Sequence, residues 1–285
     1  MNMTPTRVTL TGTGVPPPAP GRAGAGTLVQ HGDTILQFDA GRATTLRLVE
    51  SGVRTGDLSA LFLTHHHSDH CVDVADIVFT RWIQRSPELT VLAPDGPLTT
   101  FGRELLDLWR EDLSIRERVT GRDPLTIDWR AFPATTVPTV VWKNDDVTVH
   151  SVLVEHPPVA PAVAYRVDAG SVRVVVSGDT KVCRAVEELA TGADVLVHEV
   201  ALREAMPPGA DDSVYAYHAD AYELGAMAQR AGVRTLALTH LLPAPRNPAE
   251  EAAFADRVRA GGFEGEVLVG RDLMEVVVEP AGVIR

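Results

Sequence analysis

Residues 61–70 read LFLTHHHSDH, a short apolar run that leads directly into a histidine-rich run. An apolar run of this length is typical of a buried strand. His65, His67, Asp69 and His70 then form the pattern HxHxDH, so four potential metal ligands lie in one loop. Imidazole and carboxylate ligands together suit zinc, with manganese or iron as alternatives. Because four of the ten histidines lie within six residues, a metal-binding loop explains the run better than a polar surface loop does.

This loop can supply ligands to two metal ions, because its first half can reach one ion while its second half turns toward another. One loop cannot complete two coordination shells, so more ligands must come from distant segments. His156, Asp179 and His240 each stand where an apolar strand pattern meets a loop. A lone histidine at such a place is more often structural, but an HxHxDH loop that needs partners makes these three residues candidate ligands.

With these residues in view, the sequence resembles the metallo-β-lactamase superfamily, and most closely its ribonuclease Z and arylsulfatase branch. The resemblance covers most of the chain. Beside HxHxDH it rests on an ordered set of segments: GTGVP at 12–16, FDAG at 38–41, EHPPVAPAVAYRV at 155–167, SGDT at 177–180, HEVA at 198–201, His218, and LTH at 238–240.

The resemblance implies a site for two Zn²⁺ per chain, with Mn²⁺ or Fe as alternatives. One zinc would be held by His65, His67 and His156, and the other by Asp69, His70 and His240, with Asp179 bridging the two. His218 would donate a proton to the leaving group, oriented by Glu199. His198 and Asp39 would support the ligands from behind.

The chemistry implied by this site is hydrolysis. A water that bridges both metals would be delivered as hydroxide to phosphorus, sulfur or a carbonyl carbon, and Asp69 could take its proton. Two Zn²⁺, two carboxylates and one hydroxide leave a local charge of about +1. A singly charged phosphodiester or sulfate ester suits that charge.

The periodicity of the rest of the chain predicts an α/β protein. Helix patterns occur at residues 72–85, about 98–110, 182–190, 219–231 and 248–260, and residues 111–146 are less regular. Strand patterns occur at 7–10, 27–30, 35–38, 60–64, 90–93, 147–155, 162–167, 172–177, 195–198, 235–239, 266–269 and 274–278.

Two β-rich halves, each with helices, predict two mixed sheets packed face to face with helices on their outer faces, an αββα sandwich as in the metallo-β-lactamase fold. A weak internal echo, LFLTH at 61–65 and LALTH at 236–240, fits two halves. No linker divides the chain, so we expect one domain over residues 1–285.

Composition limits the partners that the chain can attract. Its 38 acidic and 26 basic residues give a formal charge of −12, which disfavours non-specific binding to nucleic acid or an anionic membrane. Cys71 and Cys183 cannot make a disulfide framework. The N-terminus has no apolar signal core, and no apolar run approaches the roughly 20 residues of a membrane span. We expect a cytoplasmic protein that does not contact membranes.

Three departures from the family pattern bear on the substrate. Ribonuclease Z enzymes that process tRNA usually carry a Gly- and Pro-rich arm between the positions of His156 and Asp179, but only 23 residues separate them here. The family's HST segment reads His218-Ala219-Asp220, and the continuation after LTH is apolar. No basic patch replaces the arm, since six Arg and seven acidic residues interleave over 103–130.

The leading hypothesis is therefore a two-zinc hydrolase of a small anionic ester, a phosphodiester or sulfate ester and possibly a lactone. The alternative is a ribonuclease Z-type tRNA 3′ processing endonuclease, which makes RNA the less favoured substrate. A second alternative is a non-hydrolytic metal-binding or redox protein on the same scaffold. Tyr215 and Tyr217 are candidates to line the substrate pocket, with ordinary packing as the alternative, and we expect a homodimer.

Overall fold

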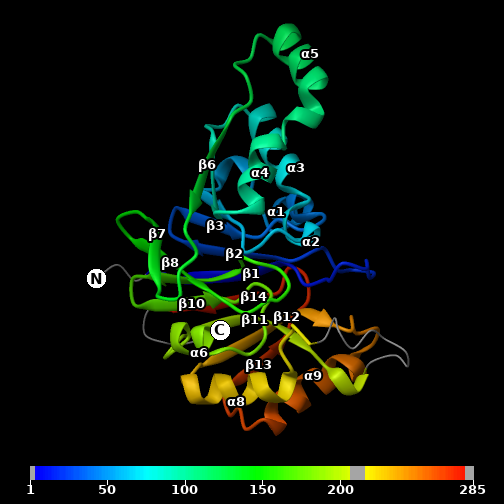
Figure 1. Ribbon diagram of the computed structural model, residues 1–285, viewed down its shortest axis with the longest axis vertical. Coiled ribbons are helices and arrows are strands. Elements are labelled where there is room, and N and C mark those ends of the chain that lie inside the picture. Colours follow the sequence, from blue (N-terminus) through cyan, green and yellow to red (C-terminus); the bar gives the residue numbers. More distant parts are fainter. Residues whose placement is uncertain (1–3, 206–215, 280–285) are drawn as a thin grey trace.

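The computed structural model describes residues 4–205 and 216–279. Two seven-stranded sheets pack face to face, and helices cover the outer face of each sheet (Figure 1). The fold class is therefore α/β, and the αββα sandwich predicted from the sequence is confirmed. One apolar cluster contains side chains from both sheets, which supports the proposal of a single domain for the described residues.

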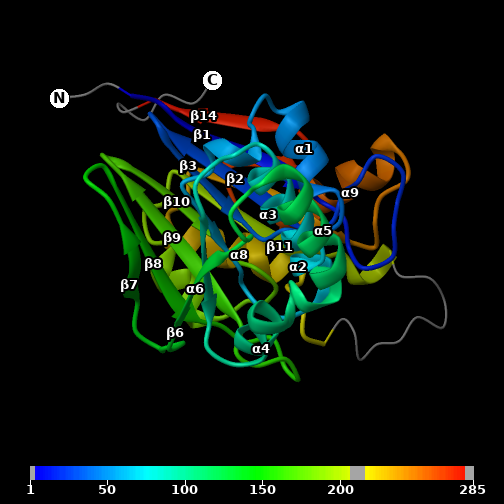
Figure 2. The same cartoon turned by 90° about the horizontal axis from the view of Figure 1, so that it is seen from above.

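The first sheet has the strand order β14-β1-β2-β3-β4-β5-β6. Its strands are β14 (Glu275–Val278), β1 (Thr6–Gly12), β2 (Gly26–His31), β3 (Thr34–Phe38), β4 (Ala60–Phe62), β5 (Leu89–Pro94) and β6 (Ile127–Phe132). Pairing is antiparallel from β14 to β3 and parallel from β3 to β6. Figure 2 shows β1 and β14 side by side, so distant parts of the sequence meet at one edge of this sheet.

The second sheet has the order β13-β12-β11-β10-β9-β8-β7. Its strands are β13 (Glu266–Val269), β12 (Thr235–Leu242), β11 (Val195–Ala201), β10 (Val172–Val176), β9 (Val163–Ala169), β8 (Val147–Leu153) and β7 (Thr139–Lys143). Pairing is antiparallel from β7 to β10 and parallel from β10 to β13. Each sheet thus has an antiparallel half and a parallel half.

The sequence echo between residues 61–65 and 236–240 falls on β4 and β12, which are not equivalent in the two sheets. In the first sheet, β4 is the strand next to the antiparallel half. In the second sheet, β11 takes that position, and β12 lies beyond β11. The two segments are similar because each combines a buried apolar strand with a candidate metal ligand, His65 or His240.

Side chains alternate between the two faces of each strand and build separate apolar layers. In β11, Val195 and Val197 point into the layer between the sheets, whereas Leu196 and Val200 point toward the helices. The helices α1 (Thr44–Glu50), α3 (Val74–Ile83) and α4 (Pro97–Glu104) cover the first sheet. The helices α6 (Arg184–Leu189), α8 (Ala221–Ala231) and α9 (Pro248–Ala260) cover the second.

The region after β5 differs most from the prediction. The helix expected at about 98–110 ends at Glu104, and a 3₁₀ turn η2 (Asp107–Trp109) leads into a separate helix, α5 (Arg110–Thr120). The irregular stretch 111–146 also holds β6 and β7. Leu113 is the one buried side chain of α5, so this helix carries no core-facing apolar stripe that could reveal it.

Three further short helical segments complete the elements named here: α2 (Ser68–Cys71), η1 (Thr55–Asp57) and η3 (Arg203–Ala205). Over the described ranges, the helices are all too short or too polar to cross a bilayer.

Candidate metal centre

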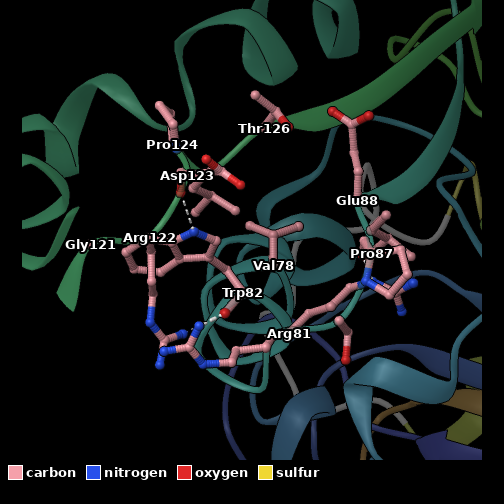
Figure 3. Close-up of a pocket in the computed structure, with 14 residues that line it drawn as sticks. Val78, Arg81, Trp82, Pro87, Glu88, Gly121, Arg122, Asp123, Pro124 and Thr126 are labelled. Atoms are coloured by element: carbon pink, nitrogen blue, oxygen red, sulfur yellow. Dashed lines mark hydrogen bonds between the residues drawn. The ribbon is translucent and has the colours of Figure 1, made fainter.

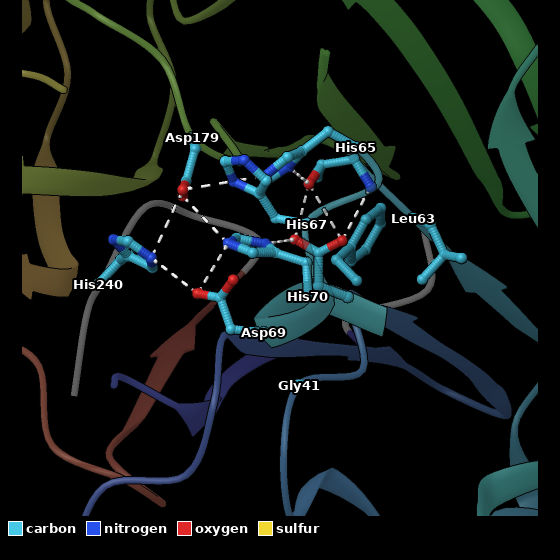
Figure 4. A network of polar contacts seen from close by, with 12 residues as sticks. Gly41, Leu63, His65, His67, Asp69, His70, Asp179 and His240 are labelled. Carbon is cyan, nitrogen blue, oxygen red and sulfur yellow. Dashed lines mark hydrogen bonds and ion pairs between the residues drawn. The ribbon is translucent and has the colours of Figure 1, made fainter. Parts of the chain in front are cut away.

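The candidate ligands come from both sheets, and most of them follow a strand directly. Figure 4 shows six of them grouped together: His65, His67, Asp69, His70, Asp179 and His240. The HxHxDH loop follows β4 in the first sheet. His156 and Asp179 follow β8 and β10 in the second sheet, and these two strands run in the same direction because both are antiparallel to β9. Their carboxyl ends therefore reach the same edge of the sandwich, where they face the loop after β4.

His240 reaches the site through an irregularity in β12. Glu199 pairs with Thr239 and Val200 pairs with Leu241, so His240 is an extra residue without a partner in β11. Its φ of 45° is positive, which is uncommon for a residue other than glycine. A bulge of this kind re-aims one side chain out of the regular alternation. Here it accompanies the placement of the His240 imidazole beside the other candidate ligands.

The structure brings all seven predicted ligands together in two groups. Within each group, the potential ligand atoms lie within 4.8 Å of one another: His65, His67, His156 and Asp179 in the first, and Asp69, His70 and His240 in the second. Asp179 also contacts the second group, since its Oδ1 is 3.2 Å from His70 Nε2 and its Oδ2 is 3.4 Å from His240 Nε2. This placement suits the predicted bridging role of Asp179.

The donor set fits divalent cations. Among the described residues, His65 Nε2 is buried without a hydrogen-bond partner, and the buried atoms His70 Nε2 and Asp179 Oδ1 have no partner beyond their own ion-pair contact at 3.2 Å. Buried polar atoms in proteins are nearly always paired, so this incomplete pairing in one cluster calls for an explanation. Ions held between imidazole nitrogens and carboxylate oxygens would satisfy them.

Hydrogen bonds behind the imidazoles orient their free nitrogens toward the centre. His70 Nδ1 lies 2.7 Å from Asp39 Oδ2, and His65 Nδ1 lies 2.9 Å from Thr64 Oγ1. His156 Nδ1 lies 3.3 Å from the carbonyl oxygen of Tyr217. Such contacts fix the tautomer and the ring orientation of metal-binding histidines. The supporting role predicted for Asp39 matches this geometry.

Burial and neighbouring charges set the protonation of the cluster. Burial lowers the pKa of His65, His67 and His156, which favours the neutral form that binds metal. Burial also opposes the charged form of His70, but the carboxylates of Asp179 and Asp39 outweigh it and raise the pKa of His70 well above its usual value.

A second pair of side chains, His218 and Glu199, borders the cluster. His218 Nδ1 is 2.8 Å from Glu199 Oε1, and both side chains are buried. The same Glu199 oxygen accepts a hydrogen bond from the Thr180 backbone N–H at 3.0 Å. Burial disfavours the His218 cation, but the Glu199 carboxylate outweighs burial and raises the pKa of His218 to about 9. One potential ligand atom from each of His218, Asp179 and His240 lies within 4.8 Å of the others.

Other predicted residues take different places. His198 is fully buried, and its Nδ1 contacts the carbonyl oxygen of Glu199 at 2.6 Å; no hydrogen bond to a candidate ligand is found among the described residues. The Tyr217 ring is half-buried and lies 5.2 Å from His156 and 4.9 Å from His218, measured between ring centroids. Tyr215 lies outside the described residues.

Sequence reasoning missed two supports of the site that use backbone atoms. One is the Tyr217 carbonyl behind His156. The other is the close approach of the FDAG loop to the backbone of Asp69, where a Cβ added to Gly41 would lie 2.2 Å from the Asp69 carbonyl oxygen. The concentration of glycine in residues 21–26 and at Gly41 was the available signal, because glycine marks places where backbones touch.

A separate cavity of about 340 Å³ lies between the end of α3 and residues 121–126. Arg81, Trp82 and Arg122 are among the residues that line it in Figure 3. Arg81 donates to the carbonyl oxygens of Thr55 and Leu58. Arg122 donates to the carbonyl oxygens of residues 82 and 83, at the end of α3. Cations are favourable at a helix C-terminus, so these contacts account for both arginines without a ligand.

The fold and the site together define a metal-dependent hydrolase of the metallo-β-lactamase type. Residues 33–241 match the family model described as a beta-lactamase superfamily domain. Over 284 residues the chain is 37% identical to ribonuclease Z of Mycobacterium sp. (strain KMS), covering 98% of each protein. It is 38% identical over 281 residues to ribonuclease Z of Mycolicibacterium paratuberculosis, covering 95% of this chain and 98% of the relative. The chain belongs to the ribonuclease Z branch of the metallo-β-lactamase superfamily.

Solved structures share the fold at lower identity. The metallo-beta-lactamase fold protein YhfI from Bacillus subtilis superposes with a TM-score of 0.74 at 24% identity, covering 96% of this chain and 99% of that one. The short form of human tRNase Z superposes with a TM-score of 0.68 at 18% identity, covering 94% and 98%.

Proposed function

We propose that the chain is a ribonuclease Z-type phosphodiesterase that cleaves RNA, with two zinc ions held between the sheets. The observation that carries this proposal is the match of nearly the whole chain to proteins named ribonuclease Z, combined with a cluster able to hold two ions. The ranking made from the sequence alone, with a small ester above RNA, is thereby reversed.

In this proposal each group of ligands would hold one ion, and Asp179, which lies near both groups, would be shared between them. When bound, the two ions lower the pKa of a water molecule and offset charge on the phosphate oxygens. Asp69 accepts the proton of the attacking water. Burial opposes the charged form of Asp69, but the contact of its Oδ2 with His240 Nε2 at 3.3 Å outweighs burial and lowers the pKa, so the carboxylate is ionised and free to accept a proton.

His218 is the proposed proton donor to the leaving oxygen. Its Nδ1 is engaged by Glu199, and the ring lies beside Asp179 and His240, so Nε2 is the nitrogen available to the substrate. Glu199 keeps His218 protonated near neutral pH, as a general acid requires. Glu199 acts through His218 and is therefore a positioning residue.

A small anionic diester remains the second candidate substrate, because the segment between His156 and Asp179 is short. The antiparallel strands β9 and β10 and short connections fill this interval, which leaves no room for an RNA-gripping arm. The formal charge of −12 adds to this difficulty. Sulfate esters, lactones and the non-hydrolytic alternative have no comparable observation in their favour.

The deciding experiment offers two substrates to one zinc-loaded preparation: a 3′-extended precursor tRNA at low salt and a chromogenic phosphodiester. The proposal expects cleavage of the precursor at its 3′ extension and none by Asp179→Ala. Turnover of the small diester with an intact precursor would transfer the assignment to the second candidate. No metal-dependent turnover of either substrate would remove both.

A further inference from the structure

The loop between β1 and β2 contacts two ligands of the second group. The Thr13 carbonyl oxygen accepts a hydrogen bond from the backbone N–H of Leu241, next to the bulged ligand His240, with the N and O atoms 3.4 Å apart. At the other end of the loop, a Cβ added to Gly24 would lie 2.9 Å from the Asp69 carbonyl oxygen, so the two backbones touch. The position of this loop therefore affects Asp69 and His240 together.

Asp272, in the turn between β13 and β14, holds the loop at both ends. Its Oδ1 accepts hydrogen bonds from the backbone N–H of Thr13 at 3.0 Å and from Thr13 Oγ1 at 2.9 Å. Its Oδ2 accepts one from the backbone N–H of Ala23 at 2.6 Å, next to the glycine that touches Asp69. One carboxylate thus fixes the two points at which the loop meets the second group.

The surroundings of Asp272 make these hydrogen bonds strong. Its side chain is 5% exposed, and Arg47 of α1 donates from Nε to Oδ2 at 2.9 Å. Arg22 donates to Thr13 Oγ1 at 2.6 Å and so completes the hydrogen bonds of that hydroxyl. Hydrogen bonds to a charged acceptor are stronger than neutral ones, and a buried donor left without its acceptor is costly. Loss of this carboxylate should therefore release the loop.

The first group of ligands has other supports. Thr64 Oγ1 contacts His65, and the Tyr217 carbonyl oxygen contacts His156. Within the described parts of the chain, the hydrogen bonds found for Asp272 join it to residues 13, 23 and 47 and to neither of these supports. A change at Asp272 should thus disturb the second group more than the first.

We propose that Asp272 is a positioning residue for the second ion, which it serves by holding Asp69 and His240 together through the loop between β1 and β2. In the structure, Asp69 Oδ2 lies 3.3 Å from His240 Nε2. Ligands that are already held in place lose less conformational entropy when an ion binds. This proposal rests on the two-ion site of the proposed function and is independent of the substrate.

A zinc titration of the metal-free chain against a chelator tests the proposal without any substrate. The step that Asp69→Ala abolishes is assigned to the second ion. Asp272→Asn keeps the size of the side chain and removes its charge, so we expect the second ion to bind about 10- to 100-fold more weakly and the first ion to bind as in wild type. Thr13→Val removes one of the hydrogen bonds and should weaken the same step by a smaller factor.

Two controls separate positioning from a general loss of stability. Glu275→Gln removes a nearby carboxylate whose contact with Arg7, at 2.8 Å, is exposed, and it should leave both zinc affinities unchanged. In the Asp69→Ala background, adding Asp272→Asn should not change the affinity of the remaining ion. A chain that is merely less stable would bind both ions more weakly, because both bind only the folded state.

The outcomes distinguish this proposal from the function on which it rests. If wild type binds two ions and Asp272→Asn weakens both equally or neither, the role of Asp272 is refuted and the two-ion site stands. If Asp272→Asn does not fold, Thr13→Val decides in the same way. A wild-type chain that binds only one zinc ion would refute the two-ion site itself, and this proposal with it.

Discussion

Replacing Glu199 by Gln removes the carboxylate charge next to His218 and keeps the shape of the side chain. Glu199 outweighs burial to hold the His218 pKa at about 9, against an ordinary value near 6.5. Without the Glu199 charge, burial lowers the pKa of His218 toward that ordinary value, against the smaller raising effect of Asp179. If the pKa returns to the ordinary value, the protonated fraction of His218 at pH 7.5 falls from about 97% to about 10%. A reaction that needs a protonated His218 slows about tenfold or more.

The sign of the pH dependence follows from the same shift. A general acid works below its pKa, so wild-type kcat falls as pH rises through the His218 pKa. In Glu199→Gln this alkaline limb moves to lower pH. Bound cations lower the His218 pKa in both proteins. The test is therefore the difference in the position of the alkaline limb between wild type and variant. NMR titration of the His218 ring measures the same shift directly.

Two diesters with different leaving groups supply the control. An alkoxide or ribose oxygen needs a proton to depart, whereas p-nitrophenolate is stable without one. Glu199→Gln should therefore slow the alkyl diester about tenfold and leave the p-nitrophenyl diester nearly unchanged, at equal metal content by elemental analysis. Equal losses on both substrates would show that His218 does not act as the proton donor.

Three further predictions concern the metal centre. Asp179→Ala should reduce zinc from about two to one or fewer ions per chain and lower kcat by at least a thousandfold; two retained ions in elemental analysis would contradict its bridging role. Asp39→Ala removes the partner of His70 Nδ1 and should weaken metal binding about 10- to 100-fold in a competition titration with a chelator, whereas unchanged affinity would leave Asp39 a purely structural part. Gly41→Ala places a Cβ 2.2 Å from a backbone oxygen and should lower the free energy of unfolding by about 1–3 kcal/mol in urea, more than Gly52→Ala, which has a positive φ but no contact within 4 Å.

The candidate ligands were predictable because each stands at or near the end of an apolar strand. HxHxDH is compact, and its need for partners made His156, Asp179 and His240 stand out. The convergence of these three side chains on the HxHxDH segment could not be predicted, because it depends on how the second sheet packs against the first and on the bulge at His240. The Tyr217 carbonyl behind His156 was invisible for a related reason, because every residue carries a carbonyl and its use depends on tertiary structure.

The fold was predictable where strands are buried and helices lie on a sheet. α9 occupies the predicted range, residues 248–260, since Asn247 and Pro248 mark its start and its apolar residues face the second sheet. α5 was missed because a helix attached through one buried side chain has the polar pattern of a surface loop.

The donors of the metal centre come from both sheets, with four on the loop after β4 and the last, His240, in β12. During synthesis, a growing chain that has not yet released residue 240 from the ribosome lacks a candidate ligand of the proposed second ion. Proteolytic fragments that end before that position lack it as well. A site that contains both groups of candidate ligands therefore requires residues 65 to 240 in one folded molecule.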